Sequence, residues 1–217
     1  MKIRSQGWLR IEPAVPHRRM QPKCCERNRS AMAERVCPWW IGYLLASPVR
    51  RWMMEKPESL LGPHVQEGMT VLEPGPGMGF FTLPLARMVG PSGRVIAVDI
   101  QAQMLASLER RARKAGLLDR IEARRALPDD LAVADWKNRI DFVLAFAMVH
   151  ETPSAEAFFR QAAAALKPGG AVFFAEPSGH VKQAGFESEL EAARHAGLEI
   201  VARPCVRRSH AAVLRKA

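Results

Sequence analysis

The sequence predicts an α/β fold in which helices cover both faces of a doubly wound, mostly parallel β-sheet. The first observation is that short apolar runs alternate with runs of helical periodicity after Gly68. The second is that glycine and proline lie at the junctions between several of these runs. The third is that the last two apolar runs are joined by a connection too short for a helical crossover, which predicts an antiparallel last strand.

The expected elements follow in chain order. Strands are expected at residues 69–72, 95–98, 140–146, 171–175, 198–201 and 211–214. Helices are expected at residues 80–89, 102–115, 154–166 and 183–196. The second helix is supported by an apolar stripe that includes Met104, Leu108 and Ala112. The turn Lys167-Pro168-Gly169-Gly170 is expected to end the third helix and to precede the next strand.

Length and composition limit the organisation of the chain. With 217 residues, 48% of them hydrophobic, the chain can bury one sizeable core. Residues 1–31 are expected to form a basic, disordered arm, which is not translated if Met20 or Met32 is the true start. Residues 32–67 are expected to form an N-terminal helical cap, and residues 68–217 the main domain. Because no apolar run approaches the ~20 residues that cross a bilayer and no secretory signal is found, a soluble, cytoplasmic protein is expected.

Charge and cysteine content limit the classes of partner. The net charge is +10, but residues 1–31 hold eight Lys or Arg against two Glu, so the remainder is only mildly basic. Neither nucleic acid nor a membrane is therefore the expected partner. The cysteines show no C-x-x-C spacing, so no metal site is expected. An alternative, in which Cys24, Cys25 and Cys37 bind a thiophilic substrate such as a metalloid, rests only on the adjacent pair and the third thiol nearby.

A glycine-rich turn follows the first expected strand, with the sequence Glu73-Pro74-Gly75-Pro76-Gly77-Met78-Gly79. Glycines permit sharp bends and let a ligand approach the backbone closely. A dinucleotide-binding loop would have its third glycine at position 80, which is Phe80. Pro76 removes an N–H that a pyrophosphate would use, and Glu73 adds a carboxylate. These features favour a ligand that carries positive charge instead of phosphate.

The second expected strand ends at Val98-Asp99-Ile100, about 20 residues beyond the last glycine. At this interval an acidic side chain accepts hydrogen bonds from a ribose diol. Ile100 can pack on the face of a purine. The combination predicts a ligand made of adenosine and a cationic, non-phosphate tail.

The run VLEPGPGMGFFTLPLARMVGPSGRVIAVDIQAQML resembles the opening motifs of class I S-adenosylmethionine-dependent methyltransferases. Residues 141–146 resemble the fourth strand of that family, and residues 166–170 resemble the turn before its fifth. The resemblance implies a Rossmann-like, seven-stranded sheet with a reversed last strand. A narrower likeness, through Cys37-Pro38-Trp39-Trp40, Ser47-Pro48-Val49-Arg50-Arg51 and residues 176–181, is to a methyltransferase type 11-like prokaryotic subgroup without a known substrate.

The resemblance also implies roles for individual residues. Glu73, Gly75, Gly77 and Gly79 would face the methionine part of S-adenosylmethionine. Asp99 would bind the ribose, Ile100 the adenine, and Phe146 the edge of the cofactor. Many family members have an acidic residue before the Leu-Pro equivalent to Leu127-Pro128, but Arg124-Arg125-Ala126 stands there in this chain. The contact to the adenine amine is therefore expected from the backbone of Ala126 and Leu127, or is absent.

Four residues near the ends of strands four and five are candidates for acid–base chemistry: His150, Glu151, Glu176 and His180. A histidine titrates near neutral pH and can take a proton from a hydroxyl or amine acceptor. The alternative is that the histidines are held in loops or at a helix cap and that Glu176 shapes the pocket. Trp39, Trp40, Tyr43 and Trp52 are expected either to form an aromatic lid or to pack an N-terminal helix.

The sequence therefore predicts methyl transfer from S-adenosylmethionine to a small-molecule acceptor by in-line displacement, with the oligomeric state left open. A methyltransferase acting on RNA or protein is the first alternative, supported by the basic arm. A catalytically silent cofactor-binding module is the second. A nicotinamide oxidoreductase is the third, and Glu73, Pro76 and Phe80 disfavour it.

Overall fold

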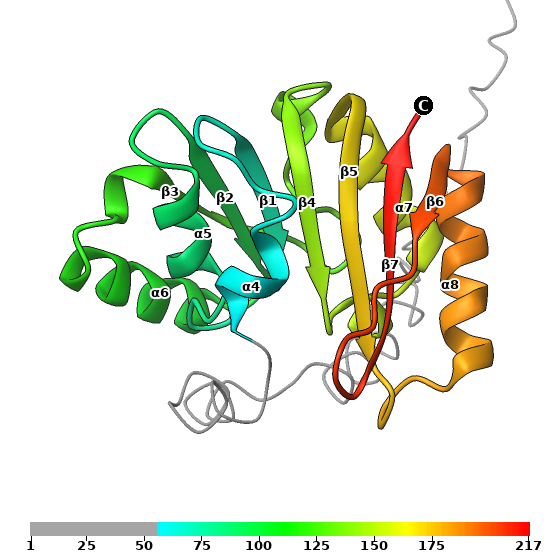
Figure 1. The fold of residues 1–217 in the computed structure, drawn as a ribbon. Helices are drawn as coiled ribbons and strands as arrows, with labels where there is room; N and C mark the ends of the chain where they lie inside the picture. The colour runs from blue at the N-terminus through cyan, green and yellow to red at the C-terminus, as the bar shows by residue number, and fades with distance from the viewer. Residues whose placement is uncertain (1–55) are drawn as a thin grey trace, which may run out of the picture. The chain divides into compact units, whose positions relative to one another are not determined.

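The computed structural model of the chain describes residues 56–217, all of which lie within one compact unit. The expected arm at residues 1–31 and most of the expected cap at residues 32–67 lie outside the described residues. The tryptophans and Tyr43 of the expected lid and Cys24, Cys25 and Cys37 lie there as well. Within the described residues the chain begins with the short helix α4, Pro57–Leu61, followed by an alternation of strands and helices (Figure 1).

A seven-stranded sheet forms the centre of the fold, with the strand order β3-β2-β1-β4-β5-β7-β6. Its strands are β1 Thr70–Pro74, β2 Arg94–Asp99, β3 Ile121–Arg125, β4 Ile140–Phe146, β5 Leu166–Pro177, β6 Leu198–Ala202 and β7 Ser209–Lys216. The ladders among β1 to β5 are parallel, whereas β7 is antiparallel to both β5 and β6. The predicted mostly parallel sheet with a reversed last strand is therefore confirmed.

Helices cover both faces of this sheet, as predicted (Figure 1). The longer helices are α5 Thr82–Met88, α6 Ala102–Lys114, α7 Ala155–Ala165 and α8 Gln183–His195. Apolar side chains of α4, α5 and α6 belong to one buried cluster, and those of α7 and α8 belong to a second cluster on the opposite face. Three short 3-10 turns, η1 Leu118–Arg120, η2 Ala134–Trp136 and η3 Val149–Glu151, complete the connections. No helix within residues 56–217 is long and apolar enough to cross a membrane.

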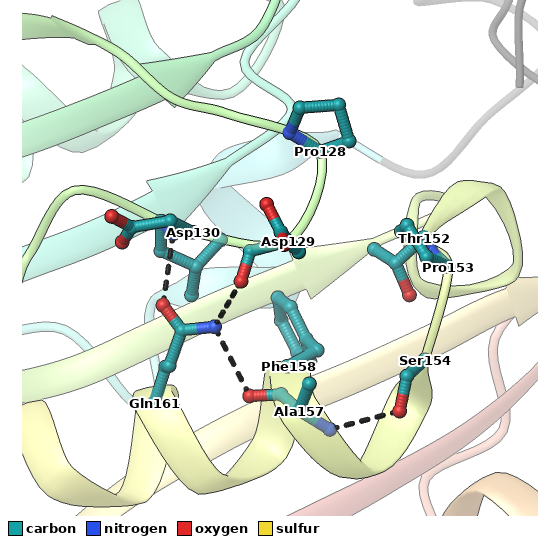
Figure 2. A pocket seen from close by; sticks show the side chains of 10 residues that line it. Pro128, Asp129, Asp130, Thr152, Pro153, Ser154, Ala157, Phe158 and Gln161 are labelled. Carbon is teal, nitrogen blue, oxygen red and sulfur yellow. Dashed lines mark hydrogen bonds between the residues drawn. The ribbon is translucent and has the colours of Figure 1, made fainter. Parts of the chain in front are cut away.

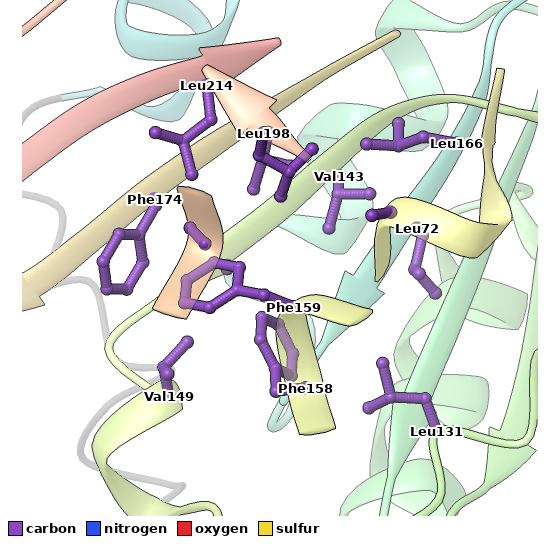
Figure 3. Packing of buried hydrophobic residues seen from close by; sticks show 14 of the residues in the cluster. Leu72, Leu131, Val143, Val149, Phe158, Phe159, Leu166, Phe174, Leu198 and Leu214 are labelled. Carbon is purple, nitrogen blue, oxygen red and sulfur yellow. The ribbon is translucent and has the colours of Figure 1, made fainter. Parts of the chain in front are cut away.

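The alternation of side chains along each strand decides which face a functional residue occupies. Leu72 packs in the cluster with α7 and α8, shown in Figure 3, so the next residue, Glu73, faces α5 and α6. Phe174 lies in the same cluster as Leu72, with its ring 5.2 Å from that of Phe159 and 4.9 Å from that of Phe186. Two residues further along β5, Glu176 therefore faces α7 and α8.

The structure differs from the expected elements in several places. The strand β3 was not predicted, because only Ile121 of its five residues is buried and no apolar alternation marks it. The turn expected at residues 167–170 lies inside the bounds of β5, where the pairing with β4 shifts between Ile140 and Phe142. The helix expected at residues 80–89 begins only at Thr82, and the first strand continues through Pro74. The last change places Glu73 within a strand, which fixes its backbone.

Candidate functional site

The glycine-rich turn directly follows β1 and bends sharply at its three glycines. Gly75, Gly77 and Gly79 have φ values of +68°, +54° and +87°, a region that residues with a Cβ rarely adopt. The Gly75 N–H donates to the Val98 carbonyl at 2.9 Å, which ties the turn to β2. The three glycines differ in their surroundings. A Cβ on Gly79 would lie 2.6 Å from Leu108 Cδ1, whereas a Cβ on Gly77 would have no atom of the described chain within 4 Å.

Gly77 therefore borders space that no described residue fills, and two interacting carboxylates lie at this end of the sheet, one of them in contact with Gly77. Glu73 is buried, with 3% of its surface exposed, and its Oε2 has no hydrogen-bond partner among residues 56–217. The neighbouring hydroxyl of Thr82 is likewise unpartnered in this part of the chain. Burial raises the pKa of Glu73 to about 8. The nearby Thr82 side chain lowers this pKa, and the negative charge of Asp99 raises it further. A buried carboxylate oxygen without a hydrogen-bond partner is unfavourable unless a ligand supplies the missing donor.

Asp99 ends the adjacent strand β2 and is the second of these carboxylates. Its Oδ1 accepts from the Gln101 N–H at 2.8 Å. Burial raises the pKa of Asp99 to about 6, and the backbone N–H groups of Gln101, Gly77 and Ile100 oppose that increase. The contact with Gly77 connects the acidic end of β2 to the glycine turn. A ligand beside Gly77 would thus meet the carboxyl ends of two neighbouring strands, the usual binding edge of an open α/β sheet.

The residues expected to contact the adenine lie in the connections that follow β2 and β3. Ile100 is half-buried and packs against the core cluster that contains Leu72. The Ala126 N–H donates to the Asp99 carbonyl at 3.0 Å. Leu127 uses its own N–H and carbonyl in hydrogen bonds to Asp130, at 2.9 and 3.2 Å, while 63% of its surface is exposed. Leu127 therefore offers an exposed apolar side chain to a ligand, and its backbone groups are already engaged.

A small hollow lies between the connection after β3 and the start of α7 (Figure 2). Its polar groups bind one another: the Gln161 amide donates to the Asp129 carbonyl and accepts from the Leu131 N–H, both at 2.9 Å. Ser154 caps α7 by accepting from the Ala157 N–H at 3.1 Å. None of the sequence-predicted site residues lines this hollow. The hydrogen bonds of Gln161 hold the connection after β3, which carries Leu127, against α7.

His150 and Glu176 form a second group at the carboxyl edge of the sheet. His150 Nδ1 lies 2.5 Å from Glu176 Oε2, and the other carboxylate oxygen accepts from the Val149 and His150 N–H groups at 2.8 and 3.2 Å. Glu176 is fully buried, so its carboxylate both anchors η3 and orients the imidazole. The hydrogen bond to Glu176 raises the pKa of His150, and the charge of Glu151 acts in the same direction. The ring of His180 stands edge-on to that of His150, with centroids 5.7 Å apart.

The predicted residues therefore form two groups at the carboxyl edge of the sheet. Glu73, Asp99 and the glycine turn make up the first, together with Ile100 and Ala126, which pack with the cluster on the α7 and α8 side. His150 and Glu176 make up the second group. Phe146 lies at the end of β4, between β1 and β5 in the sheet. It is 8% exposed, and its ring lies 4.8 Å from that of Phe81. It can therefore present only a small part of its ring to a ligand.

Sequence reasoning missed three residues that contact or face these groups. Thr82 lies beside Glu73, and the Arg111 guanidinium, from α6, donates to the Met78 carbonyl of the glycine turn. The third residue, Glu189 on α8, interacts electrostatically with both Glu176 and His150. No local motif distinguishes these residues from their neighbours, because tertiary packing alone brings them to the site.

The fold is that of Rossmann-like methyltransferases. The structure of a SAM-dependent methyltransferase from Aquifex aeolicus superposes with a TM-score of 0.74 at 23% identity and covers 84% of this chain and 100% of that chain. Residues 71–170 match the family model described as a methyltransferase domain. The predicted fold is thereby confirmed, and residues 71–170 are similar to a methyltransferase domain.

Curated relatives match about half of the chain. Arsenite methyltransferase of Aquipseudomonas alcaligenes is 30% identical over 122 residues, which cover 54% of this chain and 35% of that protein. Ubiquinone biosynthesis O-methyltransferase of Paramagnetospirillum magneticum is 34% identical over 113 residues, which cover 52% of this chain and 41% of that protein. The matched region thus spans less than half the length of these relatives. The narrower likeness to the subgroup with Cys37-Pro38-Trp39-Trp40 stays a prediction.

Proposed function

We propose that this protein transfers the methyl group of S-adenosylmethionine to a small-molecule acceptor. The observation that carries the proposal is the placement of Glu73 and Asp99 near the ends of adjacent strands, where the charge of Asp99 acts on Glu73 and Asp99 contacts the glycine turn at Gly77. A glycine turn alone is weak evidence. A turn that follows one buried carboxylate with an unpartnered oxygen and contacts a second carboxylate suits a ligand with a cationic end and a ribose.

The residues at this edge fit S-adenosylmethionine group by group. The unpartnered Glu73 Oε2 and the Thr82 hydroxyl supply acceptors for the ammonium end of the methionine part. Asp99 supplies acceptors for the ribose hydroxyls. Ile100 and the exposed side chain of Leu127 supply apolar surface for the adenine, and the backbone of Gly77 permits close approach. Ala126 holds the end of β2 by donating its N–H to the Asp99 carbonyl.

The bound cofactor supplies an electrophilic methyl group on a sulfonium. The protein has to hold an acceptor in line with that methyl group and exclude water. We assign the acceptor to the region of η3, because His150 follows β4 and its imidazole is already oriented by Glu176. In this assignment His150 takes the proton of the acceptor, Glu176 positions His150, and Glu151 and His180 border the acceptor.

Two features support a small-molecule acceptor. The curated relatives named above act, by their names, on arsenite and on a ubiquinone precursor, both of which are small molecules. The compact domain also carries no added recognition domain within residues 56–217. An RNA or protein acceptor is favoured by one observation, the eight Lys or Arg in residues 1–31. Salt-dependent RNA binding that disappears on deletion of residues 1–31 would replace the small-molecule proposal.

Calorimetric titration of the full chain with S-adenosylmethionine, and separately with NAD, tests the cofactor assignment. Asp99→Asn should weaken S-adenosylmethionine binding by about 1.5–3 kcal/mol, the usual contribution of hydrogen bonds to a charged group. Asp119→Asn is the matched control, because Asp119 is an exposed aspartate in η1 far along the chain from the turn. A preference for NAD, or equal effects of the two substitutions, would refute the proposal. Binding without methyl transfer to any acceptor in a broad panel would identify a silent module.

A further inference from the structure

Glu189 differs from the two other glutamates on the same helix. Glu187 pairs with Arg203 and Glu191 pairs with Arg194, both on the protein surface. Glu189 lies between the buried residues Phe186 and Leu190 and has a buried Oε2 without a hydrogen-bond partner in the described part of the chain. Side chains on a helix lean toward its N-terminus, and α8 begins at the carboxyl edge of the sheet just after β5. The carboxylate of Glu189 is thus held on the side of the helix that faces the core.

Glu189 shares its electrostatic environment with Glu176 and His150. Burial and the charge of Glu176 raise the pKa of Glu189 to about 7, and His150 acts in the opposite direction. Glu189 in turn is one of the groups that raise the pKa of His150. The other titratable groups around the imidazole are Glu151 on η3 and His180 after β5. The charges of Glu189, Glu176 and His150 thus influence one another.

We propose that Glu189 is the third member of a proton-holding group with His150 and Glu176, which receives the proton that the methyl acceptor loses. The inference rests on the proposed function. Because Glu176 accepts from the backbone N–H groups of Val149 and His150 and lies against the imidazole, His150 Nδ1 carries its proton toward Glu176 and Nε2 is free to accept another. The two carboxylates then stabilise the imidazolium. Glu189 is a positioning residue in this scheme, since it acts through His150.

This arrangement indicates the chemical class of the acceptor. Its attacking atom carries a proton, as a hydroxyl oxygen or an amine nitrogen does. When the oxygen bonds to the methyl carbon, the electrons of the C–S bond stay with sulfur, and the O–H proton passes to His150 Nε2. Trivalent arsenic attacks through a lone pair and has no proton on the attacking atom, so it offers no such proton for His150 to receive.

The first experiment measures the titration of His150 directly. The full-length chain, with isotope-labelled histidine, is titrated by NMR, and the His150 signal is assigned with His150→Gln. Glu189→Gln should move the midpoint of His150 to lower pH, because it removes a negative charge near the imidazole. Glu191→Gln, on the same helix, should leave it unchanged. An unchanged midpoint in Glu189→Gln, confirmed with Glu189→Ala, would overturn the inference.

The second experiment separates failure of the inference from failure of the proposed function. Calorimetry with S-adenosylmethionine should give the same affinity for the wild type and Glu189→Gln, because Glu189 lies on the opposite face from Glu73. Transfer of a radiolabelled methyl group is then compared for catechol, a primary amine and sodium arsenite across pH. Transfer to catechol or the amine, with a rising limb that moves to lower pH in Glu189→Gln, is the expected result. Absent cofactor binding in the wild type would refute the proposed function, whereas normal binding with transfer only to arsenite would refute the inference alone.

Discussion

Gly79 in the glycine turn and Leu108 on α6 are packed so closely that a Cβ on Gly79 would overlap the Leu108 side chain. A Cβ on Gly79 would lie 2.6 Å from Leu108 Cδ1, well inside van der Waals contact. The backbone of Gly79 also has a φ of +87°, which disfavours every residue with a Cβ. Helix α6 thus fixes the end of the turn that lies away from Gly77.

Gly79→Ala should therefore destabilise the protein by about 2–4 kcal/mol, because backbone strain and overpacking act together. The matched control is Gly116→Ala. Gly116 has a φ of +66°, and a Cβ there would meet no atom of residues 56–217 within 4 Å. That variant should lose only about 1 kcal/mol from strain. Equal losses in urea unfolding of the two variants would show that the contact with Leu108 does not limit the turn.

Gly77→Ala should reduce the affinity for S-adenosylmethionine much more than it reduces stability. Its φ of +54° resembles that of Gly116, and a Cβ at either position would meet no atom in the described chain within 4 Å. Their costs in unfolding free energy should thus be similar, at about 1 kcal/mol. A methyl group at Gly77 would occupy the proposed ligand space, so the affinity should fall at least about tenfold, or ~1.4 kcal/mol. Calorimetry that finds equal affinities for Gly77→Ala and Gly116→Ala would place the cofactor elsewhere.

Because the pKa of the buried Glu73 carboxyl is raised, we expect pH to have opposite effects on stability and on cofactor binding. Its pKa is raised from 4.5 to about 8, so the folded chain holds a proton that the unfolded chain releases in this window. The Glu73 contribution to the free energy of unfolding is therefore full below about pH 4.5 and is lost as pH rises through about 8. Glu73→Gln should remove this decrease, and melting curves of both proteins between pH 6 and 8.5 measure it.

The affinity for S-adenosylmethionine should change in the other direction, because its ammonium group favours ionised Glu73. We expect binding to tighten from pH 6 to 7.5, where the ammonium group stays largely protonated, and to release a proton, and both effects should be absent in Glu73→Gln. Calorimetry in two buffers with different ionisation enthalpies counts the released protons. Binding that is independent of pH in the wild type would show that Glu73 does not face the cation.

The parts of the fold that the sequence predicted are those with a local signal. Six strands and four long helices have apolar patterns of the right period, and the short link before Ala211 identified the reversed strand. Strand β3 lacks such a signal because it lies at the edge of the sheet. Its Arg124 pairs with Glu122 at 2.5 Å and with Asp135 at 2.6 Å, so polar side chains replace apolar ones on this strand.

The candidate site shows the same limit. Glu73 and Asp99 were predicted because a glycine turn and an acidic residue have a fixed spacing along adjacent strands. The distance between His150 and Glu176 depends on the register of β4 against β5, which the sequence alone does not determine. Glu189 is one of three glutamates spaced two residues apart on α8. Only the packing of Phe186 and Leu190 decides which of the three faces inward.

Arg111 is the residue outside the turn whose replacement should most directly loosen it. Its partly buried guanidinium donates to the Met78 carbonyl and so joins α6 to the turn. Arg111 lies about one helical turn after Leu108 on α6. Arg111→Met keeps the apolar stem and removes the donor, so S-adenosylmethionine affinity should fall by about 1–3 kcal/mol, as for a lost hydrogen bond from a charged donor. Arg113→Met, on the exposed side of the same helix, should change affinity by less than about 0.5 kcal/mol. Partial recovery of affinity in Arg111→Lys would identify the lost hydrogen bond as the cause, because lysine restores a cationic donor without the planar guanidinium. Arg111→Met with wild-type affinity would show that Leu108 and Gly79 hold the turn without this bond.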